Sequence, residues 1–230
     1  VAFGNGMFAA ASGAYVYTSP DGGTWPRRSL PTTSSVRTVQ YTSAGFLALL
    51  NSTFPGEYAM STDGLVWTKK QVNFNLTTSV NAMTVGVGRY VIVGNAPETL
   101  LTSADGATWT RTGPASFFNF LAAAANNTTA VAVGTNGTIY SSPDGSAWTS
   151  RSSGTSNQLN DVTFAAGSFV AVGVSGTIVT SADGATWTNR ASGTTSQLRG
   201  VSHHVDRFFA VGDSGTLLTS PDGATWAPVS

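Results

Sequence analysis

Residues 180–187 read TSADGATW, and five further copies of this phrase, identical or nearly so, occur at 18–25 (TSPDGGTW), 60–67 (MSTDGLVW), 102–109 (TSADGATW), 141–148 (SSPDGSAW) and 219–226 (TSPDGATW). The phrase always ends on a tryptophan and accounts for all six tryptophans, which are spaced 42, 42, 39, 39 and 39 residues apart. A fixed period of this length is typical of proteins in which each repeat is one small structural unit. The chain is therefore a sixfold repeat.

The clearest repeat runs from Leu159 to Ser192 and predicts four short strands. They are expected at 159–164, 169–173, 177–180 and 186–191, separated by turns that contain glycine. The second of them, FVAVG, is continuously apolar, as in a strand buried on both faces. Four antiparallel strands in about 40 residues form the blade of a β-propeller, and four to eight such blades form a ring. The sequence thus predicts an all-β fold, a six-bladed β-propeller with the Ser-x-Asp-Gly turn between the third and fourth strands of each blade.

We expect the whole chain to be a single propeller domain, with blades at about 1–30, 31–73, 74–114, 115–154, 155–193 and 194–230. It begins at a first strand and ends at a fourth strand, so no strand should be exchanged between its ends. The chain opens on Val1 rather than methionine, and we expect it to be excised from a longer protein. Residues 120–125, FLAAAA, favour a helix by composition, but the repeat register predicts a first strand there.

The recurring phrase has a structural explanation. An aspartate side chain accepts hydrogen bonds from nearby turn amides, and the glycine after it supplies the positive φ that the turn needs. The serine two positions earlier completes the same local network, and the tryptophan packs against the neighbouring blade. We therefore assign a structural role to the aspartates and tryptophans of the repeat: Asp21, Asp63, Asp105, Asp144, Asp183, Asp222, Trp25, Trp67, Trp109, Trp148, Trp187 and Trp226.

At these residues the chain resembles the Asp-box family, also called bacterial neuraminidase repeats, although its turn is one residue shorter than the usual Ser-x-Asp-x-Gly-x-Thr-Trp. It is most similar to propeller repeats of secreted or surface bacterial proteins and of the photosystem II assembly and stability factor family. The resemblance covers the whole chain. It implies the fold but not one function, since such repeats occur in sialidases, other glycan hydrolases, lectin-like propellers and protein-binding scaffolds.

Composition excludes several classes of function. Eleven acids balance eleven bases and only two lysines occur, whereas nucleic acids and anionic membranes require a basic surface. No apolar run is long enough to insert into a membrane. The chain has no cysteine, which rules out a disulfide framework, a thiol nucleophile and a cysteine–zinc site and fits a secreted or bacterial cell-surface protein. We expect no metal and no cofactor, because adjacent side chains such as His203 and His204 point to opposite faces of a strand.

Catalysis is not expected either. Seven of the eleven bases lie just after a tryptophan, on outer strands, where charges protect sheet edges from pairing: Arg27, Arg28, Lys69, Lys70, Arg111, Arg151 and Arg190. A sialidase needs three arginines and a tyrosine–glutamate pair, but only Arg37 and Arg199 share one level. A glycosidase needs two facing carboxylates, and Asp161 has no partner in the register. A sialidase-like glycosidase is therefore the least favoured alternative.

Candidate ligand contacts lie on one face of the ring, opposite the Ser-x-Asp-Gly turns. The variable loops at 51–57, 96–98 and 113–118 lie there, and variable loops on a rigid scaffold commonly carry binding sites. The residues selected are Arg37, Asn81, Asn160, Asp161, Arg199, Phe54 and Phe117. The favoured function is a non-catalytic extracellular interaction module of a larger polypeptide or assembly, with a protein or glycan ligand. A multivalent lectin with equivalent pockets between blades is the alternative, and an envelope or thylakoid assembly factor is a third hypothesis, implied by the resemblance alone.

Overall fold

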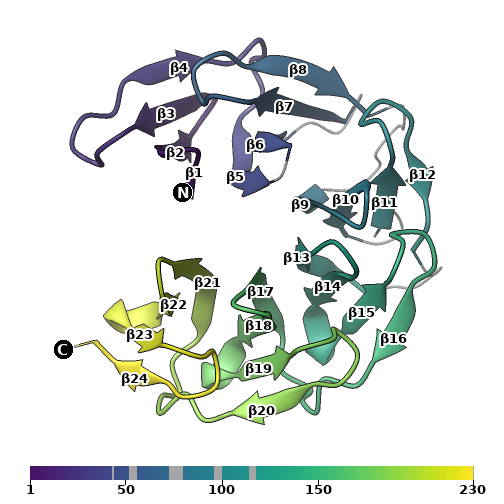
Figure 1. Cartoon of the computed structure of the whole chain (residues 1–230), viewed down its shortest axis with the longest axis vertical. Helices are drawn as coiled ribbons and strands as arrows, with labels where there is room; N and C mark the ends of the chain where they lie inside the picture. The colour runs from purple at the N-terminus through teal and green to yellow at the C-terminus, as the bar shows by residue number, and fades with distance from the viewer. Residues whose placement is uncertain (43, 52–55, 73–79, 96–99, 114–117, 230) are drawn as a thin grey trace.

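The computed structural model describes residues 1–42, 44–51, 56–72, 80–95, 100–113 and 118–229. Within these residues the chain forms 24 strands, arranged in six antiparallel sheets of four consecutive strands each. Figure 1 shows the sheets placed around a central axis, with the first strand of each innermost and the fourth outermost. The prediction of an all-β, six-bladed propeller is confirmed.

The first three blades differ in the length of their strands but share one order. Blade 1 contains β1 (Ala2–Gly4), β2 (Met7–Ser12), β3 (Tyr15–Ser19) and β4 (Arg27–Ser29). Blade 2 contains β5 (Val36–Thr42), β6 (Gly45–Leu50), β7 (Glu57–Ser61) and β8 (Thr68–Gln71). Blade 3 contains β9 (Val80–Gly86), β10 (Arg89–Gly94), β11 (Leu100–Ser103) and β12 (Thr110–Arg111).

The last three blades also contain a short 3-10 turn between their second and third strands. Blade 4 contains β13 (Phe120–Ala125), β14 (Ala130–Gly134), η1 (Thr135–Gly137), β15 (Ile139–Ser142) and β16 (Thr149–Arg151). Blade 5 contains β17 (Leu159–Ala165), β18 (Ser168–Gly173), η2 (Val174–Gly176), β19 (Ile178–Ser181) and β20 (Thr188–Arg190). Blade 6 contains β21 (Leu198–His204), β22 (Arg207–Gly212), η3 (Asp213–Gly215), β23 (Leu217–Ser220) and β24 (Ala227–Pro228). The alanine-rich segment is a strand, β13, as the repeat register predicts.

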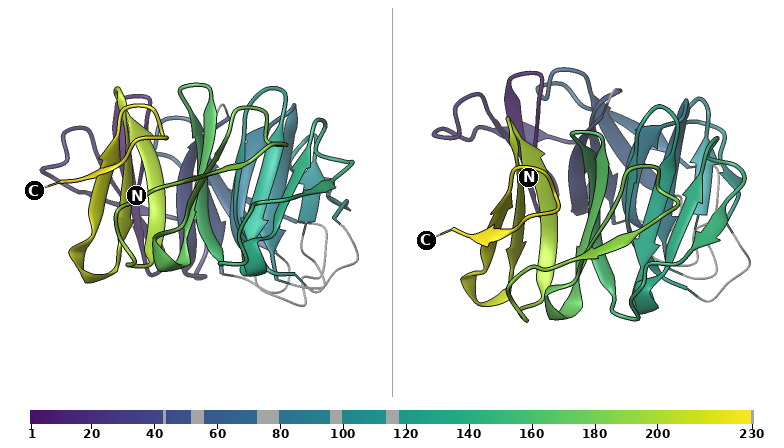
Figure 2. Two further views of the ribbon diagram at one scale, coloured as in Figure 1. Left: turned by 90° about the horizontal axis from the view of Figure 1, so that it is seen from below. Right: turned by 60° about the horizontal axis from the view of Figure 1, so that its bottom comes forward.

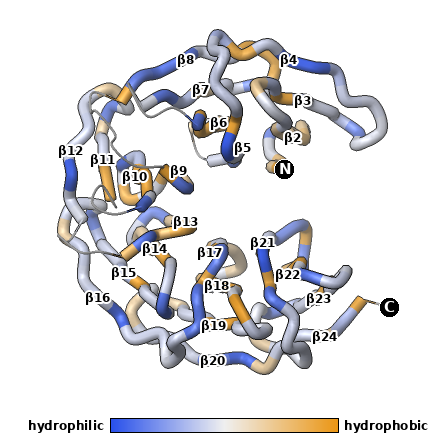
Figure 3. Tube along the Cα trace, turned by 180° about the vertical axis from the view of Figure 1, so that it is seen from behind, coloured by the Kyte–Doolittle hydropathy of each residue, from blue (hydrophilic) through white to orange (hydrophobic). Residues whose placement is uncertain are grey.

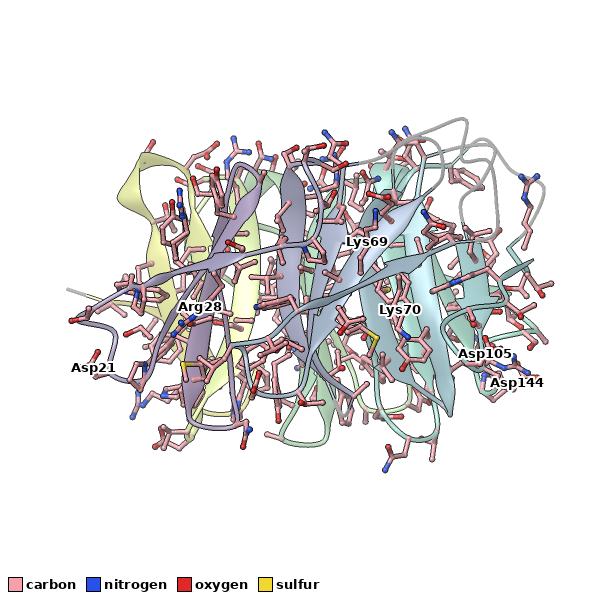
Figure 4. All side chains as sticks on the ribbon, turned by 90° about the horizontal axis from the view of Figure 1, so that it is seen from above. Asp21, Arg28, Lys69, Lys70, Asp105 and Asp144 are labelled. Atoms are coloured by element: carbon pink, nitrogen blue, oxygen red, sulfur yellow. The ribbon has the colours of Figure 1, made fainter. Side chains whose placement is uncertain are left out.

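The blades stand side by side, with their strands running between two faces of the molecule (Figure 2). We call the face that carries the six Ser-x-Asp-Gly turns the turn face. The opposite face, which carries the 3-10 turns and the links from one blade to the next, is the loop face. In Figure 4 the labelled aspartates Asp105 and Asp144 lie together at the lower right, on the turn face.

Each Ser-x-Asp-Gly turn is closed by its own side chains. In the turn of blade 5, Asp183 Oδ1 accepts hydrogen bonds from the N–H groups of Ala185 and Thr186, both at 2.8 Å. The Ser181 hydroxyl donates to the same carboxylate at 3.0 Å and accepts the Gly184 N–H at 2.8 Å, while Gly184 has a φ of 73°. In all six turns the carboxylate accepts the serine hydroxyl and two N–H groups. The predicted local network is present.

Most of the hydrophobic core lies between blades. Each of five clusters of buried apolar side chains joins two consecutive blades. Five of the six tryptophans, all but Trp25, belong to or pack against these clusters. Trp67 packs with Ala9 and Val16 of blade 1, and Trp109 meets Tyr58 of blade 2 edge to face, with 5.9 Å between ring centroids. The outer strands β4, β8, β12, β16 and β20 are hydrophilic (Figure 3). A blade therefore gains most of its stability from its neighbours.

The ring is open. Blades 1 and 6 lie on either side of a gap in the ring in Figure 1. Across that gap the structure places Phe3 of β1 against His204 of β21, edge to face, with 5.4 Å between ring centroids. No helix in the described part of the chain has the length and apolarity of a membrane span.

Candidate functional site at the loop face

Five first strands carry a β-bulge at the same position, near the loop face. In each case the pairing register with the second strand skips one residue, and the residues skipped are Arg37, Asn81, Leu121, Asn160 and Arg199. A bulge leaves its extra residue out of the ladder and changes the direction of its side chain. Four of the candidate ligand contacts therefore occupy structurally equivalent positions on the innermost strands.

The two bulge asparagines connect consecutive blades. Asn81 Nδ2 donates to the carbonyl of Phe120 in blade 4 at 2.7 Å, and Asn160 Nδ2 donates to the equivalent carbonyl of Leu198 in blade 6 at 2.7 Å. Asn81 is also nearly fully buried. These side chains hold first strands together, so the structure gives them a role in packing that does not require a ligand.

Asp161 has a similar role. Its Oδ2 accepts the N–H of Val201 in blade 6 and its Oδ1 accepts the N–H of Val162, both at 2.9 Å. Burial raises the pKa of Asp161 to about 6, although the two backbone hydrogen bonds oppose that rise. The carboxylate thus joins blade 5 to blade 6 from the position beside the bulge. Sequence reasoning missed this bond because the partner is a backbone group 40 residues away.

The two bulge arginines are exposed. An Arg37 Nη2 group donates to Asn81 Oδ1 of the following blade at 2.6 Å. The Arg199 guanidinium pairs in two places with the Asp213 carboxylate at the start of η3, one of them an Nη2–Oδ2 contact of 3.1 Å. The side chain of Arg199 is 62% exposed, and the ion pair holds the pKa of Asp213 below its ordinary value. Of the candidate ligand contacts that the structure describes, Arg37 and Arg199 are the exposed ones.

A polar groove of about 770 Å³ lies on the same face, between the links that enter and leave blade 5. Its walls come from the links at 154–157 and 191–195, its floor from the 3-10 turn and Thr177, and its outer side from Asn189 and Arg190. Asn157 Nδ2 donates to Thr177 Oγ1 at 2.8 Å and Asn189 Nδ2 donates to the Gly154 carbonyl at 3.2 Å. These bonds fix the lining side chains, so the groove is preformed, and its volume falls in the range of ligand sites. No candidate residue of the sequence analysis lines it.

The arginines of the outer strands are more than edge charges. Arg28, Arg151 and Arg190 are half-buried, and each Nε donates at 2.8 Å to a third-strand hydroxyl, those of Thr18, Ser141 and Thr180. Figure 4 shows Arg28, Lys69 and Lys70 along the outside of the ring, where Lys69 pairs with Glu57 at 3.0 Å. The prediction that such residues only protect sheet edges was therefore incomplete.

The remaining residues considered in the sequence analysis are two phenylalanines in the variable loops and two histidines. Phe54 and Phe117, and most of the variable loops at 51–57, 96–98 and 113–118, lie outside the described residues. The two histidines point to different partners, since His203 packs on Phe208 and His204 on Phe3. Among the described residues no three His, Cys, Asp or Glu side chains come close enough to hold a metal ion.

No family model matches the chain, and no curated protein matches it. Solved structures do match it. They include YCF48 bound to a D1 peptide, with a TM-score of 0.67 and 18% identity over 95% of this chain and 75% of that chain, and YCF48 from Cyanidioschyzon merolae, with 0.68 and 18% over 95% and 80%. Virginiamycin B lyase from Staphylococcus aureus gives a TM-score of 0.75 and 10% identity over 94% of this chain and 77% of that chain. The likeness is one of fold. At these identities it supports the expected similarity to a photosystem II assembly factor as a shared propeller architecture, while membership of the Asp-box family stays a prediction.

Proposed function

We propose that this chain is a binding module that takes up a polypeptide segment on its loop face. The observation that carries the proposal is the preformed polar groove on blade 5, with the exposed Arg199 on the strand that follows its wall. Rigid concave surfaces with a few oriented polar groups are what specific sites require. A fold-level relative with a bound peptide, YCF48 with a D1 peptide, supports a polypeptide as the ligand.

The chemistry of the groove favours an extended segment with an acidic side chain. Asn189 presents an amide and Arg190 a guanidinium beside the groove, and Arg199, although paired with Asp213, adds a further exposed guanidinium on the same face. Guanidinium groups bind carboxylates with directional, charge-assisted hydrogen bonds. The backbone of the segment would contact the amide and hydroxyl groups of the walls.

The experiment uses a displayed library of random peptides as the probe. Peptides selected on the wild-type chain should lose at least about tenfold in affinity when Arg199 is changed to Glu. The substitution replaces a cation that attracts the acidic side chain of the peptide by a carboxylate that repels it. The matched control is Arg207→Glu, because Arg207 lies in the same blade with a side chain 50% exposed, but at the turn face. Equal loss in both variants, or enrichment of no peptide, would show that the loop face is not a polypeptide site.

The lectin alternative requires equivalent pockets in several blades. The groove depends on Asn189, and the corresponding positions hold Ser150 in blade 4 and Pro228 in blade 6. A glycan array probed in parallel tests this alternative. Binding of sugars without peptides would replace the proposed function by the lectin hypothesis.

We further propose that the module is not an enzyme. Asp161 is the carboxylate considered for catalysis, and both of its oxygens are engaged by backbone N–H groups of the fold. Purified protein should therefore not hydrolyse sialosides or other glycosides, and turnover that Asp161→Asn abolishes would contradict this. A secreted or bacterial cell-surface location remains a hypothesis from composition and resemblance, which fractionation of the source cells would test.

A further inference from the structure

The five interfaces between blades are built from the same positions. On the side that faces the next blade, each blade presents two alternate residues of its second strand and one residue at or next to the start of its third strand. In blade 5 these are Val170, Val172 and Ile178, which are fully buried against Phe208 and Ala210 of blade 6. The equivalent residues of blades 2, 3 and 4 are at most 2% exposed: Leu47, Leu49, Tyr58, Val91, Val93, Leu100, Val131, Val133 and Ile139.

Blade 6 presents the same pattern, but none of the hydrophobic clusters formed by the described residues covers it. Its three residues are Phe209, Val211 and Leu217. Val211 is 49% exposed, and Phe209 and Leu217 are half-buried. Three large apolar side chains at the positions that blades 2 to 5 bury form one unpartnered half of the repeating interface.

Blade 1 presents the other half. On the side that faces the previous blade, blade 6 buries Phe208, Ala210, Leu218 and Trp226. The equivalent residues of blade 1 are Phe8, Ala10, Tyr17 and Trp25, and all four are half-buried. We call these two sets together, Phe209, Val211 and Leu217 of blade 6 and Phe8, Ala10, Tyr17 and Trp25 of blade 1, the open seam.

Among the described residues no hydrophobic cluster joins the two halves. They lie on opposite sides of the gap in the ring (Figure 1), and the ring contact that the described residues make across it is that of Phe3 with His204, outside both sets. From the continuity of the repeating interface we infer that the open seam binds one further blade of the same repeat. Such a blade would bury its own Phe-Ala-Trp side against blade 6 and its aliphatic side against blade 1.

The absence of cysteine allows a direct test by single-cysteine labelling. Val211→Cys places a thiol in the open seam, Val172→Cys places one at the same position of a closed interface, and Val66→Cys places one on an exposed turn. In the chain as it is, a maleimide should modify Val211→Cys within about threefold of the rate of Val66→Cys, and Val172→Cys at least about 100-fold more slowly, because a buried thiol reacts only after opening. Circular dichroism confirms that each variant is folded.

The second half of the test supplies a further blade. A copy of residues 152–190, which contains one link and four strands, is appended after residue 230. We expect modification of Val211→Cys to slow by at least about tenfold, modification of Val66→Cys to stay unchanged, and Tm to rise by at least about 5 °C, since repeat proteins gain stability from each new interface.

Three results would overturn the inference. Protection of Val211→Cys in the original chain at every protein concentration would mean that blades 1 and 6 close directly on each other. Protection that increases with concentration, together with a dimer mass by light scattering, would make a second copy of the chain the occupant. An unchanged labelling rate after the blade is appended would show that the seam does not accept a blade.

Discussion

Asp161 is a carboxylate whose ionised form is disfavoured by burial, although Oδ2 accepts the N–H of Val201 in blade 6 and Oδ1 accepts the N–H of Val162 in its own strand. Its pKa is raised from 3.8 to about 6 in the folded chain. Between these two values the folded state holds a proton that the unfolded state has lost. Stability from this group is therefore greatest at low pH and falls as pH rises through about 6.

The first prediction compares unfolding free energies of the wild-type chain and Asp161→Asn in urea titrations from pH 4 to pH 7. The wild type should lose about 1–2 kcal/mol relative to the variant over this range, because the residue is half-buried and water screens part of the effect. The amide of the Asp161→Asn variant has one acceptor oxygen and no titration in this range, so the variant serves as the reference for the pH profile. Parallel pH profiles would contradict the raised pKa.

Thr219 of blade 6 lacks the arginine that donates a hydrogen bond to the equivalent third-strand hydroxyl in other blades. Its Oγ1 is buried and has no hydrogen-bond partner among the residues that the structure describes, whereas the equivalent hydroxyl of Thr180 accepts the Arg190 Nε at 2.8 Å. The position equivalent to Arg190 is Val229, which is 47% exposed. An unsatisfied buried hydroxyl costs about 1–3 kcal/mol.

The second prediction concerns two opposite substitutions, one at Val229 in blade 6 and one at the equivalent Arg190 in blade 5. Val229→Arg should stabilise the chain by about 1 kcal/mol, because it supplies the missing donor, and Arg190→Ala should destabilise it by about 1–2 kcal/mol. Both are measured by urea titration at pH 7. If Val229→Arg has no effect on stability while Arg190→Ala does, the unsatisfied hydroxyl of Thr219 does not destabilise the chain.

Residues engaged in local turns were predictable from the sequence, but those engaged between blades were not. The six aspartates bond to amides two and three positions away, so spacing reveals them. The sequence did contain a sign of the bulge, because the apolar positions Leu159, Val162 and Phe164 are spaced by three and then two residues, which breaks the strict alternation of a regular strand. The bonds of Asn160 and Asp161 to blade 6 depend on how blades pack and have no local signal.

At the scale of the element, the stability that each Ser-x-Asp-Gly turn supplies depends on pH. Hydrogen bonds from turn amides lower the pKa of all six aspartates, to about 2 for Asp105 and Asp222. The stability they supply is fully present above 3.8 and is lost as pH falls toward 2, the reverse of Asp161. We therefore expect the chain to be most stable in mildly acidic solution, between the two regimes.

The third prediction removes the serine of one turn. Ser181 is buried, and its hydroxyl is the acceptor for the Gly184 N–H. Ser181→Ala should cost about 1–2 kcal/mol, because it leaves that N–H unsatisfied. The control is Ser150→Ala on the exposed strand β16, which should change stability by less than about 0.5 kcal/mol. Equal effects would mean that the turn is satisfied by water.

At the scale of the whole molecule, the tryptophans are not equivalent, although the sequence presents them as copies. Trp109 is 2% exposed in the cluster between blades 2 and 3, whereas Trp25 faces the open seam and is half-buried. The sequence counts the blades but does not show whether the ring closes, because closure depends on the small rotation between neighbours summed over all blades.

The fourth prediction uses that difference. Trp109→Ala should lower the free energy of unfolding by about 3–5 kcal/mol, and Trp25→Ala by about 1–2 kcal/mol, because less surface is buried around Trp25. Urea titrations of both variants measure the losses. Equal losses would show that Trp25 is enclosed in solution.

The open ring also has a kinetic consequence. In a closed ring every blade is held on two sides, so none can leave without breaking two interfaces. Blades 1 and 6 are each held on one side, and a linear array of repeats opens from its ends. Backbone amides should therefore exchange with deuterium fastest in β1–β4 and β21–β24 and slowest in β10 and β14, near the middle of the array.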